Sequence, residues 1–176
     1  MTPMCNKQPF RWLTAAFLIM AANFLAIARS APAVHLDADG LSPRPIEPLT
    51  GTTIAHHYAQ AWTDLAEAMD SGQTSLLGEE FVGFAKDRLA KRIKEQREAG
   101  LHVHIVDHGH QLKAVFYSAD GTAMQLIDRA QLEIQTFDGS RLLDTDNAPR
   151  EYIVLLTPGA DRWYVRDLEE VSVKNF

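Results

Sequence analysis

Cysteine is nearly absent from this chain, since the only one is Cys5, close to the N-terminus. Beyond residue 5 the chain therefore has no disulfide, no cysteine-ligated zinc site and no cysteine nucleophile. The sequence also lacks a glycine-rich phosphate-binding loop, the G-x-S-x-G and H-E-x-x-H motifs, and a dinucleotide-binding fingerprint. These absences argue against several enzyme classes and leave the stability of the protein to a hydrophobic core.

One long apolar run, from Trp12 to Ala28, follows Lys7 and Arg11. A basic start, an apolar run and small residues that a signal peptidase can cut are typical of a secretory signal. Residues 1–33 are therefore predicted to be a cleaved signal peptide. A retained single-pass anchor is the alternative, since about 20 apolar residues suffice to cross a bilayer. In both cases the positive-inside rule predicts export of the rest of the chain. A cleaved chain would be released to the bacterial periplasm or the medium, and an anchored chain would stay tethered to the membrane with its domain outside the cytoplasm.

Removal of residues 1–33 makes the chain more acidic. Lys and Arg fall from 17 to 14 against 23 Asp and Glu, so the net charge changes from −6 to −9. Such a surface repels nucleic acid and anionic lipid. We therefore expect no nucleic-acid partner, and contact with a membrane only through Trp12 to Ala28 if that run is uncleaved.

Residues 34–50 contain three prolines, which disfavour helix and favour an extended chain. This segment is predicted to be a linker. The remaining residues, 51–176, have the usual size of one domain with one core.

Two amphipathic helices are predicted at the start of this domain. The first begins near Thr52 or Thr53, ends at Ser71–Gly72, and repeats apolar residues at helical spacing. The second runs from about Glu79 to Ala99. The apolar face of the first helix comprises Ile54, Tyr58, Ala61, Trp62, Leu65, Ala68 and Met69. The apolar face of the second comprises Phe81, Phe84, Ala85, Leu89 and Ile93.

After Gly100 the spacing of apolar residues changes to two, which is typical of strands. A turn is predicted at Asp107–His110, a two-residue hairpin turn at Asp120–Gly121 and a further reversal at Asp138–Gly139. Helices followed by strands predict an α+β domain with an antiparallel sheet folded against the helices. The predicted inward residues between the first two turns are Leu112, Ala114 and Phe116.

This order resembles the NTF2-like superfamily over Thr52 to Val173. The resemblance rests on the first helix with Tyr58 and Trp62, the long strand through Asp128, and the ending DRWYVRDLE. It implies a cone in which a strongly curved antiparallel sheet wraps the N-terminal helix. It also implies two kinds of role, because the superfamily includes enzymes with an Asp or His inside the cone and membrane-tethered interaction modules.

Asp128 shares a strand face with Leu126 and Ala130, which points its carboxylate toward the core. A buried carboxylate needs a partner, and Tyr58 could complete a polar pair with His104 as a third group. In a cyclase-, isomerase- or dehydratase-like enzyme, Asp128 would be the base and Tyr58 a hydrogen-bond donor. The favoured interpretation is instead a β-bulge at this point that turns Asp128 outward.

His102 and His104 share one face of a predicted strand and lie within reach of one metal ion. A closed metal site needs a third or fourth ligand, which His108, His110, Asp107 or the pair His56–His57 could supply only if folding brings them near. A solvent-facing strand edge is therefore favoured, and no metal or other cofactor is expected.

The sequence favours an exported or membrane-tethered module without catalytic activity. Such a module would bind a protein partner or a small apolar ligand, with Tyr58, Trp62 and Asp128 as candidate contacts, and a homodimer is an open alternative. The second hypothesis is a cone-fold enzyme with acid–base chemistry. A histidine-based metal-binding domain is the weaker third.

Overall fold

The computed structural model describes residues 31–171 of the chain. The predicted signal or anchor, Trp12 to Ala28, lies outside the described residues. Among residues 31–171, no helix is both long and apolar enough to cross a membrane.

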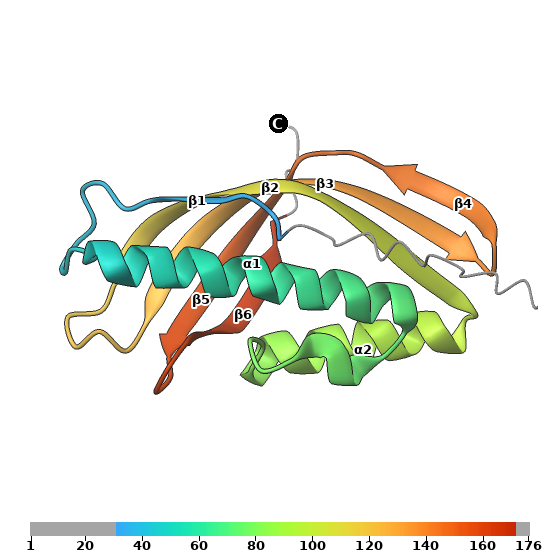
Figure 1. Cartoon of the computed structure of the whole chain (residues 1–176), viewed down its shortest axis with the longest axis horizontal. Helices are drawn as coiled ribbons and strands as arrows, with labels where there is room; N and C mark the ends of the chain where they lie inside the picture. Colours follow the sequence, from blue (N-terminus) through green and yellow to red (C-terminus); the bar gives the residue numbers. More distant parts are fainter. Residues whose placement is uncertain (1–30, 172–176) are drawn as a thin grey trace, which may run out of the picture.

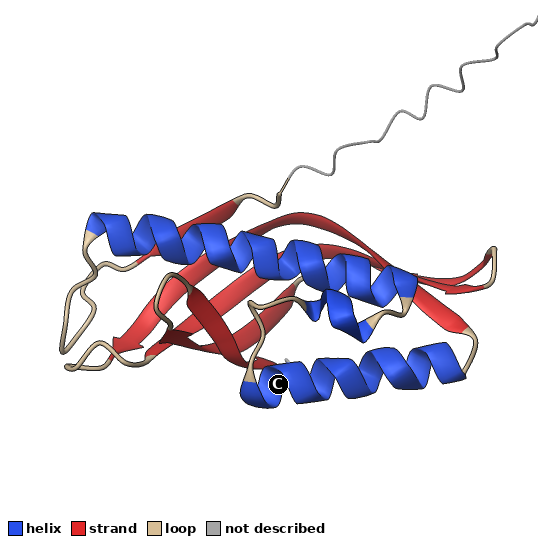
Figure 2. Ribbon diagram, turned by 60° about the horizontal axis from the view of Figure 1, so that its bottom comes forward, coloured by secondary structure: helices blue, strands red, loops and turns tan. Residues whose placement is uncertain are grey.

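The described chain is an α+β fold in which a curved sheet arches over two helices (Figure 1). Both helices lie on the same face of the sheet, and the core fills the space between them and that face (Figure 2). The two helices are α1 (Pro48–Ser71) and α2 (Gly83–Glu98), and the short 3-10 helix η1 (Thr74–Leu77) lies between them in the chain. The strands are β1 (Val34–Asp37), β2 (Leu101–Tyr117), β3 (Met124–Asp138), β4 (Arg141–Asp146), β5 (Arg150–Pro158) and β6 (Trp163–Glu170).

The strands follow the order β1-β2-β3-β5-β6, and β4 pairs with the second half of β3. Every pair is antiparallel except β1 with β2, which is parallel. The sheet is therefore mixed, and the prediction of a purely antiparallel sheet is wrong. The difference comes from β1, which lies in the segment that was expected to be a linker.

Residues 34–50 belong to the domain and do not form a separate linker. β1 adds a strand to the sheet edge, with Val34 opposite His110 of β2. α1 already begins at Pro48, because proline is well tolerated in the first turn of a helix, where its missing N–H is not needed.

α2 begins at Gly83, four residues later than predicted. The residues before it are held against β6, where Val165 N donates to Glu80 O (2.7 Å) and Val82 N donates to Val165 O (3.0 Å). These bonds use backbone groups that a helix would need. The predicted apolar face is also wrong at one position, since the side chain of Phe84 is 70% exposed.

β2 is a single strand of 17 residues, and the turn predicted at Asp107–His110 is a β-bulge within it. Before the bulge Val103 and Ile105 are buried, whereas after it Leu112 and Ala114 are buried. One extra residue moves the inward positions from odd to even numbers, because side chains alternate along a strand.

A second register shift lies between Ala114 and Phe116. It returns the inward position to Tyr117, which is 5% exposed, and leaves Phe116 43% exposed, contrary to the prediction. The connection from β2 to β3 is also longer than a two-residue turn, since it covers Ser118 to Ala123.

Candidate functional site

Asp128 of β3 is fully buried. Its Oδ2 atom accepts a hydrogen bond from Tyr58 Oη at 2.7 Å and lies 2.8 Å from His110 Nδ1. The pairing of β3 with β5 is continuous through Asp128, so the favoured prediction of a bulge that turns this residue outward is wrong. Asp128 keeps the inward position between Leu126 and Ala130, and Tyr58 meets it from α1.

His110 of β2 links Asp128 to a second carboxylate, because its Nε2 atom lies 2.8 Å from Asp107 Oδ2. Burial alone lowers the pKa of His110, but the hydrogen bonds and charges of Asp107 and Asp128 together raise it to about 9. The ring is therefore an imidazolium at neutral pH, and it donates one N–H to each carboxylate.

These four residues, Asp107, His110, Asp128 and Tyr58, form what we define as the buried polar cluster. Burial, followed by the charge of Asp128, raises the pKa of Tyr58, so its hydroxyl stays protonated and donates. The ring of Trp62 lies against His110 with centroids 4.6 Å apart, an arrangement that stabilises a cation. Asp128 Oδ1 has no hydrogen-bond partner among the described residues.

The bulge in β2 is what turns His110 inward, and it depends on Gly109. This residue has a φ of +125°, which side chains other than glycine rarely adopt. A Cβ atom there would also lie only 3.0 Å from Ala33 O. Asp107 Oδ1 accepts a hydrogen bond from Gly109 N (2.8 Å), and His110 N donates to Ala33 O (2.9 Å).

His104, the predicted third group, does not reach this cluster. It lies opposite Gln135 on β3, seven residues along that strand from Asp128, and its Nδ1 atom is 3.2 Å from Asp70 Oδ2. The structure brings His110 to Asp128 in its place.

His102 stacks on Phe137 of the neighbouring strand, with ring centroids 5.1 Å apart and planes 7° from parallel. Within residues 31–171, no group of three or more His, Cys, Asp or Glu side chains is placed to hold a metal ion. His102 and His104 therefore gain no third protein ligand in this part of the chain.

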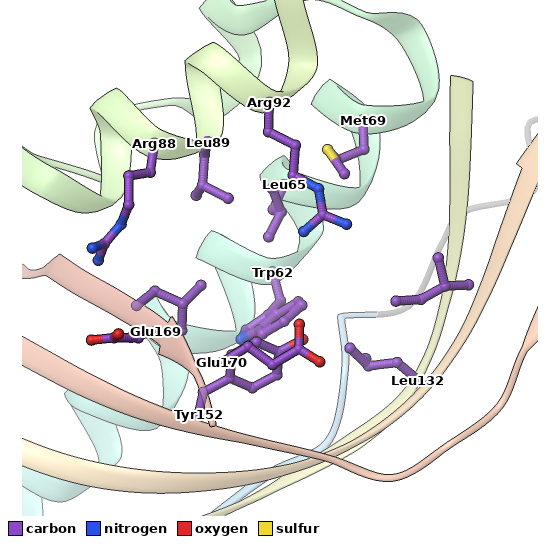
Figure 3. Close-up of a pocket in the computed structure, with 12 residues that line it drawn as sticks. Trp62, Leu65, Met69, Arg88, Leu89, Arg92, Leu132, Tyr152, Glu169 and Glu170 are labelled. Carbon is purple, nitrogen blue, oxygen red and sulfur yellow. The ribbon is translucent and has the colours of Figure 1, made fainter. Parts of the chain in front are cut away.

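A pocket of about 280 Å³ lies between α1, α2 and the sheet (Figure 3). Its floor is aromatic and consists of Trp62 from α1 and Tyr152 from β5, whose rings meet edge to face at 5.4 Å. Its walls are aliphatic and comprise Leu65, Met69, Leu89, Leu132, Ile134 and Leu168.

Four charged residues surround the mouth of the pocket: Arg88 and Arg92 from α2, and Glu169 and Glu170 from β6. Arg88 forms an ion pair with Asp167, and Glu170 forms one with Arg150. Figure 3 shows the side chain of Arg92 reaching from α2 over the pocket toward Trp62.

Trp62 separates this pocket from the buried polar cluster. It forms part of the pocket lining and also packs on His110. Neither His110 nor Asp128 lines the pocket, and both side chains are 0% exposed. The buried histidine and carboxylate therefore have no contact with the open pocket.

Analysis of the sequence alone considered His110 only as a further metal ligand and did not connect it with Asp128, and it did not place Arg88 and Arg92 of α2 at a pocket. A signal for His110 is present, because the inward positions change from odd to even numbers across Gly109, which is what a bulge produces. Arg92 gives no such signal, since its place among interleaved charges on α2 is typical of a solvated helix face.

The sequence matches no protein-family model. No curated protein matches it either.

Solved structures are similar to this chain at low sequence identity. The crystal structure of the intermembrane space region of the chloroplast protein ARC6 is 16% identical with a TM-score of 0.61, over 73% of this chain and 98% of that one. ActVI-ORFA from Streptomyces coelicolor is 9% identical with a TM-score of 0.49, over 71% of this chain and 98% of that one. A Streptomyces avermitilis protein of the NTF2-like family is 11% identical with a TM-score of 0.44, over 68% and 96%. The similarity to the ARC6 region, at a TM-score of 0.61, shows the fold alone, and it agrees with the NTF2-like fold that the sequence predicted.

Proposed function

We propose that this chain is an exported or membrane-tethered binding module without catalytic activity, which holds a small apolar ligand in the pocket between α1, α2 and the sheet. The single observation that carries this proposal is the position of Trp62, with the open pocket on one side and the buried acid–base groups on the other.

The lining of the pocket supports an apolar ligand. Ligand sites in proteins are usually concave and mostly apolar, with a few polar groups that fix orientation. Here an aromatic floor and aliphatic walls leave polar groups only at the mouth and on the Tyr152 ring.

The hydrogen bonding of the buried cluster supports a structural role for Asp128 and His110. A general acid or base must reach the proton that it transfers, directly or through one water. Both nitrogens of His110 are already bonded to carboxylates, and Trp62 covers the ring. The cluster thereby stabilises the contact between α1 and the sheet, from which Tyr58 and Asp128 come.

Export is the part of the proposal that rests on sequence. The basic residues before Trp12 to Ala28 and the small residues after that run favour translocation of the domain.

Binding can be tested with a neutral apolar fluorophore, N-phenyl-1-naphthylamine, on the full-length chain held in amphipol. We expect binding to wild type, loss of binding in Leu89→Trp, which fills the pocket, and retention in Phe84→Trp. The second variant is a matched control, because Phe84 lies on the same helix but is exposed. No binding to wild type, or equal binding to the two variants, would contradict the proposal.

Export can be tested separately with a C-terminal alkaline phosphatase fusion in a bacterium, since that enzyme needs disulfides that form outside the cytoplasm. We expect activity from the wild-type fusion and loss when Leu18→Arg interrupts the apolar run. An inactive wild-type fusion that accumulates intact would overturn the exported location.

A cone-fold enzyme is the second candidate, favoured by one observation: the free Oδ1 atom of buried Asp128. If Trp62 moved aside, this oxygen could act as a base toward a ligand in the pocket. Asp128→Asn separates the two candidates, because a binding module keeps its affinity for the fluorophore whereas an enzyme loses turnover of whatever substrate is identified.

A further inference from the structure

Two hydrogen-bond donors at the pocket have no partner among residues 31–171. Arg92 forms no ion pair there, although Arg88 beside it and Glu170 across the mouth are both paired. The side chain of Tyr152 forms a ring contact with Trp62 and no side-chain hydrogen bond within the described chain, and its ring is part of the pocket floor.

We propose that the pocket takes a small apolar carboxylic acid, with the carboxylate bound by Arg92 and the Tyr152 hydroxyl and the apolar body held above Trp62. This inference rests on the proposed binding function and names the chemical class of its ligand.

The chemistry of the two donors fits a carboxylate. A guanidinium presents parallel N–H groups that match the two oxygens of a carboxylate. Burial, and then the charge of Glu170, raises the pKa of Tyr152, so its hydroxyl remains a donor across the neutral range. Both residues line the same pocket, and Figure 3 shows the Arg92 side chain reaching toward Trp62, whose ring meets that of Tyr152.

The size of the pocket limits the apolar body. An apolar cavity of about 150 Å³ holds benzene with its six carbons, so a pocket of about 280 Å³ takes a ligand of about ten non-hydrogen atoms. Octanoate, with its eight carbons and two oxygens, therefore matches the pocket when its carboxylate extends to the mouth.

Glu169 and Glu170 would favour a ligand with an amine head group. Their positions relative to Arg92 therefore decide whether the pocket prefers an amine or a carboxylate. Glu170 is paired with Arg150, which is only 16% exposed in its side chain. Figure 3 places Glu169 near Arg88 and away from Arg92. Arg92 and Glu169 are thus the two charged residues of the pocket that form no ion pair within the described chain, and of these it is Arg92 that reaches toward the aromatic floor.

The test compares octanoate, octanol and octylamine on the full-length chain in amphipol by ¹⁹F NMR with 5-fluorotryptophan. The chain contains three tryptophans, Trp12, Trp62 and Trp163. The signal of Trp62 reports on the pocket floor, and the signal of Trp163, assigned through Trp163→Phe, serves as an internal reference. We expect the Trp62 signal to titrate with octanoate at lower concentration than with octanol, and octanol at lower concentration than with octylamine.

Arg92→Gln should weaken octanoate about tenfold and leave octanol within about twofold, because only the charged head group loses its partner. Tyr152→Phe should weaken octanoate less than Arg92→Gln does. Lys94→Gln is the matched control, since it removes one positive charge from the exposed side of α2.

The outcomes distinguish the two proposals. If octanol binds, but octanoate binds no more tightly than octanol or Arg92→Gln does not weaken the binding of octanoate, the carboxylate inference is wrong and the binding function stands. If octylamine binds best, the glutamates determine the head group and the inference is likewise wrong. If none of the three ligands shifts the Trp62 signal, the proposed binding function fails with it.

Discussion

On one side of Trp62, His110 and Asp128 are closed to solvent and satisfied almost entirely by each other and by Asp107 and Tyr58. On the other side, an apolar pocket is open and its donors Arg92 and Tyr152 have no partners within the described chain. The same aromatic ring forms the boundary of both. Charged groups that resemble a catalytic constellation therefore lie behind the wall of the pocket and do not line it, so strong perturbation of a pKa alone does not mark an open site.

The largest expected effect is a loss of stability when the buried polar cluster on one side of Trp62 is disrupted. His110→Ala removes the cation between Asp107 and Asp128 and leaves two carboxylates without compensation, one of them fully buried. Breaking such a buried pair costs about 3–5 kcal/mol of the free energy of unfolding. Urea denaturation followed by circular dichroism measures this loss.

His102→Ala is the matched control for that variant, because it removes a histidine from the same strand at a partly exposed position outside the cluster. Its cost should stay below about 1 kcal/mol. Equal losses in the two variants would show that the buried cluster has no special role in stability.

A second effect is the pH dependence of unfolding. The folded pKa of His110, about 9, lies above its ordinary value near 6.5, so its stabilising contribution is complete below pH 6.5 and is lost as the pH rises through 9. The free energy of unfolding should fall by about 3 kcal/mol over this window. Thermal unfolding at a series of pH values measures it.

His110→Gln should abolish this slope, since glutamine does not titrate. Asp64 titrates at lower pH than His110, because burial and the neighbouring Glu80 raise its pKa only to about 6. Its titration should therefore not obscure the difference in pH dependence between wild type and His110→Gln. A wild-type slope that persists in His110→Gln would assign the effect to other groups.

Much of this architecture is predictable from the sequence, and the failures have local causes. Helical spacing predicts α1 and its contact face, and alternation along β3 places Asp128 inward. The sequence nevertheless favoured an outward Asp128, because its partner His110 faces the core only after the bulge at Gly109. β1 was missed because four residues before a proline-rich segment carry little pattern, and only pairing with β2 makes them a strand.

The smallest expected effect concerns the wall of the pocket, where Leu89 is only partly buried. Leu89→Ala should cost about 1 kcal/mol, because part of its surface faces the pocket in wild type and little additional cavity is created. Leu77→Ala, which empties a fully buried position, should cost about 2–5 kcal/mol by the same denaturation measurement. Leu89→Ala also enlarges the pocket, so decanoate should gain affinity relative to octanoate in this variant and not in Leu77→Ala. If both variants lose the same stability and neither changes the preferred chain length, then Leu89 is an ordinary core residue and the space beside it does not determine ligand size.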